Sequence, residues 1–148
     1  MAYFTYDTSV CISRKVVDFQ KMPPNFLLSA VVLMELMAGA PDESRRRLYR
    51  EVFRIYQRDN LIIVPTAEDW LLAAKVLHLL SEARRRVQTG KLKRLPPGAS
   101  QRLALDVLIA VSARRWKARV VTENWGDFKA IQRYCNTTIV KAAQFFRK

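Results

Sequence analysis

The sequence contains very little cysteine and histidine, with two cysteines and one histidine in 148 residues. Zinc sites use Cys and His ligands at short, regular spacings, and no such spacing occurs here. Two cysteines also make no disulfide framework, so we interpret Cys11 and Cys135 as reduced, structural thiols. His78 lies in a helical segment away from every motif, and we interpret it as structural. These absences exclude a disulfide-stapled secreted domain and a Cys/His zinc centre.

Long apolar runs and a secretory leader are also missing. No apolar stretch reaches the roughly 18 residues that a membrane-spanning helix needs. No basic region precedes an apolar one near residue 1, as it would in a signal peptide. We therefore expect a cytoplasmic protein with no membrane contact. The sequence has no internal repeat or low-complexity segment, and its length predicts a single domain, residues 1–148.

Acidic residues are scarce, with 13 against 26 Lys and Arg, which gives a net charge of +13 and a pI near 10.4. A small domain with this excess of positive charge often binds a polyanion, most commonly nucleic acid. The alternative is that Arg-rich helix faces only keep the protein soluble. The densest basic cluster, which we predict to contact nucleic acid, comprises Arg84, Arg85, Arg86, Lys91, Lys93 and Arg94.

Short apolar segments alternate with amphipathic ones along the chain. The apolar segments predict strands at residues 3–6, 26–28, 61–64, 119–122 and 137–140. The amphipathic segments predict helices at about 8–19, 29–37, 42–59, 66 to the basic run at 84, 101–117 and 125–134. Strands that alternate with helices are typical of a parallel α/β sheet covered on both faces.

The ends and apolar faces of these helices can also be predicted. Thr8 or Ser9 is a suitable N-cap for the first helix, and Ser29 for the second. The apolar stripes of the third and fourth helices include Leu48 and Trp70, which we expect to face the core.

Four acidic residues occur in or beside apolar elements. Asp106 lies in the apolar run 103–111, Asp7 follows the first strand, Glu35 lies within 31–37, and Asp127 follows the fourth strand. An unpaired carboxylate is costly in a core, so each needs a partner or a water-filled cleft. Because sites in parallel sheets form outside the carboxyl ends of the strands, we expect the four acids to meet there.

An all-oxygen ligand set suits Mg²⁺ or Mn²⁺ rather than zinc. An acidic cleft in a basic protein suits metal-assisted hydrolysis of a phosphodiester, because basic side chains can hold the phosphate backbone. Each acid also has a structural alternative. Asp7 could be a helix cap, Glu35 could pair with a buried Arg, Asp106 could belong to an ion pair, and Asp127 could cap or charge the first turn of its helix.

Residues 6–10, 28–39, 106–113 and 121–128 resemble, in that order, the motifs of the PIN-domain ribonucleases, and most closely those of VapC-type toxins. The resemblance spans nearly the whole chain. It implies a PIN-like three-layer sandwich with a central five-stranded parallel sheet flanked by helices. It also implies a Mg²⁺-dependent (or Mn²⁺-dependent) endoribonuclease of a type II toxin–antitoxin system that cleaves tRNA or rRNA, a homodimer, and a cognate antitoxin as partner.

The resemblance also assigns roles to individual residues. Asp7 and Asp106 match the principal metal-binding acids, Glu35 the acid of the second motif, and Asp127 the last acid, with Thr8, Ser9, Thr122 and Asn124 as supporting polar residues. Thr122 and Asn124 could equally be caps or strand-end residues. Leu105 stands where the family often has a polar residue, and the basic loop around Pro96 is longer than in compact members. The alternative function is a catalytically silent or housekeeping PIN domain that binds RNA or a protein partner, although the intact set of four acids favours an enzyme.

Overall fold

The computed structural model describes residues 1–87 and 99–147. Its strands are β1 (Phe4–Tyr6), β2 (Leu28–Ser29), β3 (Ile62–Ile63), β4 (Arg119–Thr122) and β5 (Ile139–Lys141). Its helices are α1 (Thr8–Ser13), the 3-10 helix η1 (Phe19–Lys21), α2 (Ala30–Ala38), α3 (Glu43–Arg58), α4 (Ala67–Val87), α5 (Ala99–Arg115), α6 (Trp125–Gln132) and α7 (Ala142–Phe145). Within these ranges no helix is long and apolar enough to cross a membrane. The order of elements is that of an alternating α/β protein.

All strand pairs are parallel, but the strands form two small sheets, β1-β4-β5 and β2-β3. The expectation of one five-stranded sheet is therefore wrong. An isolated bridge joins the sheets: Phe4 accepts a hydrogen bond from the Leu27 N–H (2.9 Å) and donates its own N–H to the Asn25 carbonyl (3.1 Å). The strands are short because helix caps end them. Asp7 directly follows β1 and caps α1, and Ser29 is both the last residue of β2 and the cap of α2.

The N-caps of α1 and α2 decide where the candidate acids lie. Asp7, and not Thr8 or Ser9, caps α1, because its Oδ1 accepts the Val10 N–H at 3.1 Å. This helix also ends at Ser13 rather than near residue 19, since the chain turns at Lys15 with φ of 50°. The predicted cap Ser29 is confirmed: its Oγ accepts the Val32 N–H at 3.4 Å. Ser29 thereby places Glu35 in the second turn of α2.

Each of two predicted core faces is buried for the most part but includes a residue that the structure exposes. On α3 the buried side chains are Tyr49, Val52 and Tyr56, whereas Leu48 is 37% exposed. On α4 the predicted core residue Trp70 is 59% exposed, because its neighbour Asp69 faces α5 instead. The Asp69 carboxylate lies 3.0 Å from the guanidinium of Arg115 on α5 and accepts the Thr66 N–H at 2.9 Å. This pairing turns Asp69 toward α5 and leaves Trp70 at the surface.

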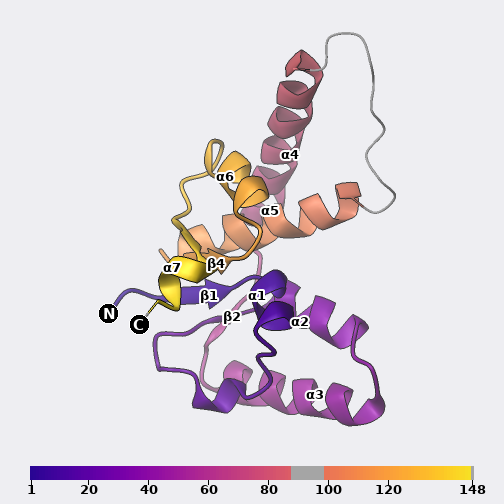
Figure 1. Ribbon diagram of the computed structural model, residues 1–148, viewed down its shortest axis with the longest axis vertical. Helices are drawn as coiled ribbons and strands as arrows, with labels where there is room; N and C mark the ends of the chain where they lie inside the picture. Colours follow the sequence, from indigo (N-terminus) through magenta and orange to yellow (C-terminus); the bar gives the residue numbers. More distant parts are fainter. Residues whose placement is uncertain (88–98, 148) are drawn as a thin grey trace.

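The helices surround the strands and leave the carboxyl end of β1 facing α1 (Figure 1). In that view α3 lies on one side of the strands and α5 and α6 on the other, and the far end of α4 projects from the body. The short helix α7, absent from the sequence prediction, returns the C-terminal segment to β1. There the ring of Phe145 lies 5.0 Å from that of Phe4, and Phe146 lies 5.6 Å from Tyr6. The start of α1 is therefore anchored from several elements.

We predict that the Tyr56 hydroxyl stabilises the fold. It donates a hydrogen bond of 2.6 Å to the Phe19 carbonyl in the core, so Tyr56→Phe leaves that buried acceptor with only a long contact to the Met22 N–H. The free energy of unfolding, measured in urea, should fall by roughly 1–2 kcal/mol. The matched control is Tyr134→Phe, because the Tyr134 hydroxyl has no hydrogen bond within residues 1–87 and 99–147. Equal loss in both variants would contradict the prediction.

Candidate active site

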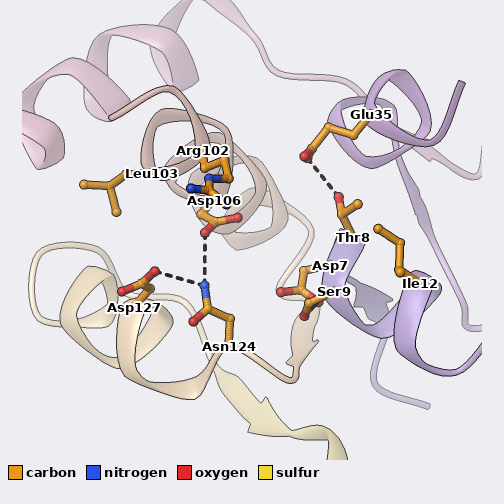
Figure 2. Close-up of a pocket in the computed structure, with 10 residues that line it drawn as sticks. All are labelled: Asp7, Thr8, Ser9, Ile12, Glu35, Arg102, Leu103, Asp106, Asn124 and Asp127. Carbon is orange, nitrogen blue, oxygen red and sulfur yellow. Dashed lines mark hydrogen bonds between the residues drawn. The ribbon is translucent and has the colours of Figure 1, made fainter. Parts of the chain in front are cut away.

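A cavity of about 540 Å³ opens at the carboxyl end of β1, between α1 and α2 on one side and α5 and α6 on the other (Figure 2). Its lining includes all four acids singled out in the sequence. The lining residues are Asp7, Thr8, Ser9, Ile12, Glu35, Arg102, Leu103, Asp106, Asn124 and Asp127. Four segments far apart in the sequence thus contribute carboxylates to one hollow.

Asp7 is the most deeply buried of the four acids, with 1% of its surface exposed. Its Oδ1 accepts the Ser9 hydroxyl at 2.6 Å as well as the Val10 N–H, and its Oδ2 accepts the Thr122 hydroxyl at 2.6 Å. Burial raises the pKa of Asp7 above its usual value, and these three donors oppose the rise. Asp7 therefore caps α1, as the structural alternative predicted, and it also lines the cavity.

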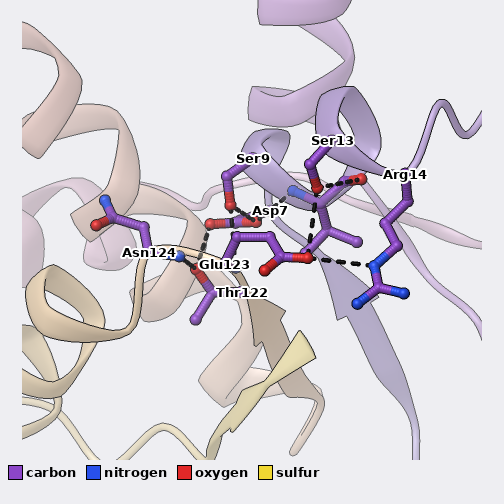
Figure 3. Close-up of polar contacts among 8 residues, drawn as sticks. Asp7, Ser9, Ser13, Arg14, Thr122, Glu123 and Asn124 are labelled. Carbon is purple, nitrogen blue, oxygen red and sulfur yellow. Dashed lines mark hydrogen bonds and ion pairs between the residues drawn. The ribbon is translucent and has the colours of Figure 1, made fainter. Parts of the chain in front are cut away.

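A polar network ties the start of α1 to the end of β4 (Figure 3). The Asn124 N–H donates to the Thr122 hydroxyl at 2.8 Å, and the Glu123 N–H donates to the Ser9 hydroxyl at 3.2 Å. The Glu123 carboxylate in turn pairs with Arg14 at 3.2 Å. Sequence reasoning missed Glu123 and Arg14. The position of Glu123 between two predicted site residues was the only available signal, since the pairing with Arg14 is tertiary.

Asp106 lies half-buried on α5, and its carboxyl group is the most strongly perturbed of the four. Burial is the largest cause, and the negative charges of Asp7, Glu35 and Asp127 add to it, so that the pKa of Asp106 rises to about 7. The Asn124 side-chain amide, 3.5 Å away, opposes the rise. Among the described residues, the ion pairs involve other carboxylates. Asp106 therefore forms no ion pair with any described residue, which contradicts the structural alternative.

Arg102 is a second residue that sequence reasoning missed. It precedes Asp106 by four residues on α5, which is about one helical turn, and it lines the same cavity. That spacing was a usable signal. Its guanidinium contributes a positive charge at the rim of the cavity without neutralising Asp106.

Glu35 and Asp127 lie on opposite sides of the cavity (Figure 2). Glu35 Oε1 accepts the Thr8 hydroxyl at 2.8 Å. Burial raises the pKa of Glu35, the Thr8 hydrogen bond lowers it, and the charge of Asp7 raises it. Asp127 Oδ2 accepts the Asn124 side-chain amide at 3.0 Å. The same amide nitrogen lies 3.5 Å from Asp106 Oδ2, so the Asn124 side chain is shared by these two acids.

The donors in the cavity are carboxylate, hydroxyl and amide oxygens, a set that suits a hard divalent cation. Within residues 1–87 and 99–147, however, no three Asp, Glu, His or Cys side chains lie close enough to hold one metal ion jointly. Mg²⁺ usually keeps several waters and needs only one or two protein carboxylates. The residues present therefore fit a largely hydrated Mg²⁺ or Mn²⁺, with Asp7 and Asp106 as the central acids.

The described residues of the predicted basic cluster do not line this cavity. Arg84, Arg85 and Arg86 lie in the last turn of α4, whose end stands away from α1 and α2 (Figure 1). The other predicted members, Lys91, Lys93 and Arg94, lie outside the described residues. These three arginines could contact only a substrate that extends well beyond the acids.

Comparison with known proteins supports the fold. No protein-family model and no curated protein matches the chain. Among solved structures, VapBC-1 from nontypeable Haemophilus influenzae includes a similar chain, with a TM-score of 0.60 and 20% identity over 97% of this chain and 99% of that one. FitAB bound to an IR36 DNA fragment includes another, with a TM-score of 0.55 and 15% identity over 94% of each chain. The α/β fold described here is thus shared with both over almost the full length.

The raised pKa of Asp106 predicts a characteristic dependence of stability on pH. An unfolded aspartate titrates near 3.8, whereas Asp106 in the fold titrates near 7. The folded protein therefore holds this proton more tightly, and Asp106 lowers stability progressively as pH rises through that window, with no further loss above it. In EDTA at neutral pH, Asp106→Asn should melt no lower than the wild type, and the difference should narrow toward pH 4.

Thermal unfolding in EDTA between pH 4 and 8 measures this difference. The control is Asp18→Asn, which removes an exposed carboxylate paired only with Lys21, and whose melting profile should stay parallel to that of the wild type. Strong destabilisation of Asp106→Asn at neutral pH would instead make Asp106 a structural residue.

Proposed function

We propose that this protein is a Mg²⁺-dependent (or Mn²⁺-dependent) endoribonuclease of the PIN type that acts in the cytoplasm as the toxin of a type II toxin–antitoxin system and cleaves tRNA or rRNA. One observation carries the proposal: four carboxylates from four segments line one cavity, where burial and then the repulsion from the other three acids raise the pKa of Asp106 to about 7. Repulsion of this kind is offset when a divalent cation is bound. The net charge of +13 on the whole chain suits a polyanionic substrate.

A bound Mg²⁺ would supply an activated water and neutralise charge on the phosphodiester. The chain's own residues do the rest. Three donors fix the Asp7 carboxylate before substrate arrives, so its orientation requires no rearrangement during the reaction. The Asn124 amide donates a hydrogen bond to Asp127 and makes a longer contact with Asp106, and so helps to orient both acids. Arg102, at the rim, is positioned to contact a substrate phosphate.

The toxin role and the partners are proposed from the sequence resemblance to VapC-type toxins, and the two structural neighbours support the toxin role. VapBC-1 and FitAB are toxin–antitoxin complexes, and one chain of each shares the fold of this chain. From the resemblance we propose a cognate antitoxin as protein partner and a homodimer as the assembly. A neighbouring short reading frame that encodes a DNA-binding protein would support the toxin role over a housekeeping nuclease.

We expect cleavage to depend on the acids as a unit. Asp7→Asn and Asp106→Asn each remove a charged oxygen at nearly constant shape, so RNA cleavage should fall by orders of magnitude. RNA binding should persist, because it depends on Lys and Arg rather than on the carboxylates. Mapping of cleavage sites on total cellular RNA, with and without Mg²⁺, gives the readout. Full cleavage by Asp106→Asn in Mg²⁺ would refute the proposal.

The same variants separate a nuclease from a catalytically silent domain. Mn²⁺ that binds the folded site should raise the melting temperature of the wild type with concentration, and should raise that of Asp106→Asn much less. A domain that binds RNA but shows neither cleavage nor this metal-dependent shift would be the silent alternative.

The arginines at the end of α4 offer a separate prediction about RNA affinity. If Arg84, Arg85 and Arg86 bind phosphates, their joint replacement by Gln should reduce the slope of log affinity against log salt by roughly 0.7–0.9 for each phosphate that is no longer neutralised. A triple variant on α3 that replaces Arg45, Arg47 and Arg54 by Gln provides the control for net charge. An equal slope in both variants would mean that the α4 arginines are only a solvated surface.

A further inference from the structure

A second group of charged residues lies beside the acidic cavity, and its charge is opposite. The ring of Trp125, the first residue of α6, has two ammonium groups near it: Lys129 Nζ lies 5.1 Å and Lys141 Nζ 4.8 Å from the ring centroid. Both nitrogens lie about 5 Å from one point, so they are at most about 10 Å apart. Trp125 is half-buried and both lysines are exposed. We call these three residues the Trp125 cluster.

The positive charge of the Trp125 cluster is not balanced by neighbouring acids. No ion pair of either lysine occurs within residues 1–87 and 99–147. In that part of the chain, the only hydrogen bond given by an ammonium group of the cluster runs from Lys129 Nζ to the neutral Gln132 Oε1 at 2.7 Å. The negative face of the indole offsets the positive charge of each ammonium group only in part. Both groups can therefore still bind an anion.

The Trp125 cluster continues the sheet edge on which the cavity lies. Lys141, the last residue of β5, is paired in register with Thr122, the last residue of β4, and Thr122 holds the Asp7 carboxylate. Neighbouring strands lie about 4.8 Å apart, so the cluster begins about one strand beyond the residue that fixes Asp7. Trp125 also directly follows Asn124, which lines the cavity. At the carboxyl ends of these strands, acidic side chains are therefore followed by basic ones within about the length of one nucleotide.

We propose that Trp125, Lys129 and Lys141 form a phosphate-binding subsite that holds the RNA backbone where it leaves the acidic cavity, an inference that rests on the proposed function. The two ammonium groups bind neighbouring phosphates of a single strand. Trp125 acts by keeping both ammonium groups near its ring, not by reading a base. The subsite recognises the backbone without regard to sequence. Its position on the same edge as the candidate catalytic acids favours RNA over an acidic protein as the ligand.

The test measures RNA binding apart from cleavage. In an Asp106→Asn background in EDTA, the affinity for a labelled single-stranded RNA is measured by fluorescence anisotropy over a range of salt. Joint replacement of Lys129 and Lys141 by Gln should lower the slope of log affinity against log salt by about 1.4, since each neutralised single-strand phosphate contributes about 0.7. The matched control replaces Lys21 and Lys75 by Gln, which removes the same charge from exposed positions outside the cavity and should change the slope little.

Trp125 variants test whether the ring holds the lysines. Trp125→Leu should lower RNA affinity and reduce the salt slope in the same direction as the double lysine variant, because the ammonium groups separate. Trp125→Phe keeps an aromatic face and should retain most of the wild-type RNA affinity and salt slope. Melting temperatures of each variant show whether the fold is retained. If Trp125→Leu is folded and binds RNA with the wild-type slope, the assigned role of the ring is wrong.

Other outcomes separate this inference from the proposed function. If the double lysine variant matches its control in salt slope and, with Asp106 intact, in RNA cleavage, the subsite is refuted while the nuclease stands. If the double variant loses affinity for poly-glutamate but not for RNA, the cluster is a surface for an acidic protein and the proposal is overturned. If the wild type binds RNA without cleaving it, the proposed function fails. The salt slope of the double lysine variant then still shows whether the subsite binds RNA.

Discussion

The burial of the Asp7 carboxylate at the end of β1 is the constraint on which the site depends. With 1% of its surface exposed, this group needs donors at both oxygens, and it obtains them from Ser9, Val10 and Thr122. Satisfying Asp7 therefore fixes the start of α1 and brings the end of β4 beside it. The segment after β4 carries Asn124, so the same constraint positions the amide that reaches the other acids. A local requirement of one buried acid thus organises three segments of the chain.

Charges of the two signs are distributed unequally between the surface and the cavity. On the surface, acids pair with arginines: Glu43 with Arg46, and Glu51 with Arg54. In the cavity the described carboxylates receive hydroxyl and amide hydrogen bonds but form no ion pairs, although the protein has twice as many basic as acidic residues. Hydroxyls and amides orient a carboxylate without cancelling its charge. The carboxylates in the cavity therefore keep their negative charges, which a bound cation or a proton can offset.

Much of the fold was predictable because local signals determine it. The alternation of strands and helices, the cap at Ser29 and β4 at its predicted residues all depend on short stretches of sequence. The failures concern tertiary geometry. Leu48 and Trp70 both fit the apolar period of their helices, and only tertiary packing decides that they are exposed. The division into two sheets likewise depends on where Asp7 and Ser29 leave the strands to cap helices.

The candidate site shows the same division between local and tertiary information. Each of the four acids is conspicuous in the sequence because it interrupts or follows an apolar run, and strand order places such residues at one edge. Nothing local indicates that Glu123 would pair with Arg14, or that Lys141 would lie over Trp125, since these contacts join residues 109 and 16 positions apart. Residues that conflict with their surroundings can be found from sequence, because the conflict itself is local. Residues that resolve a conflict, or balance a charge, are found only when the fold brings the segments together.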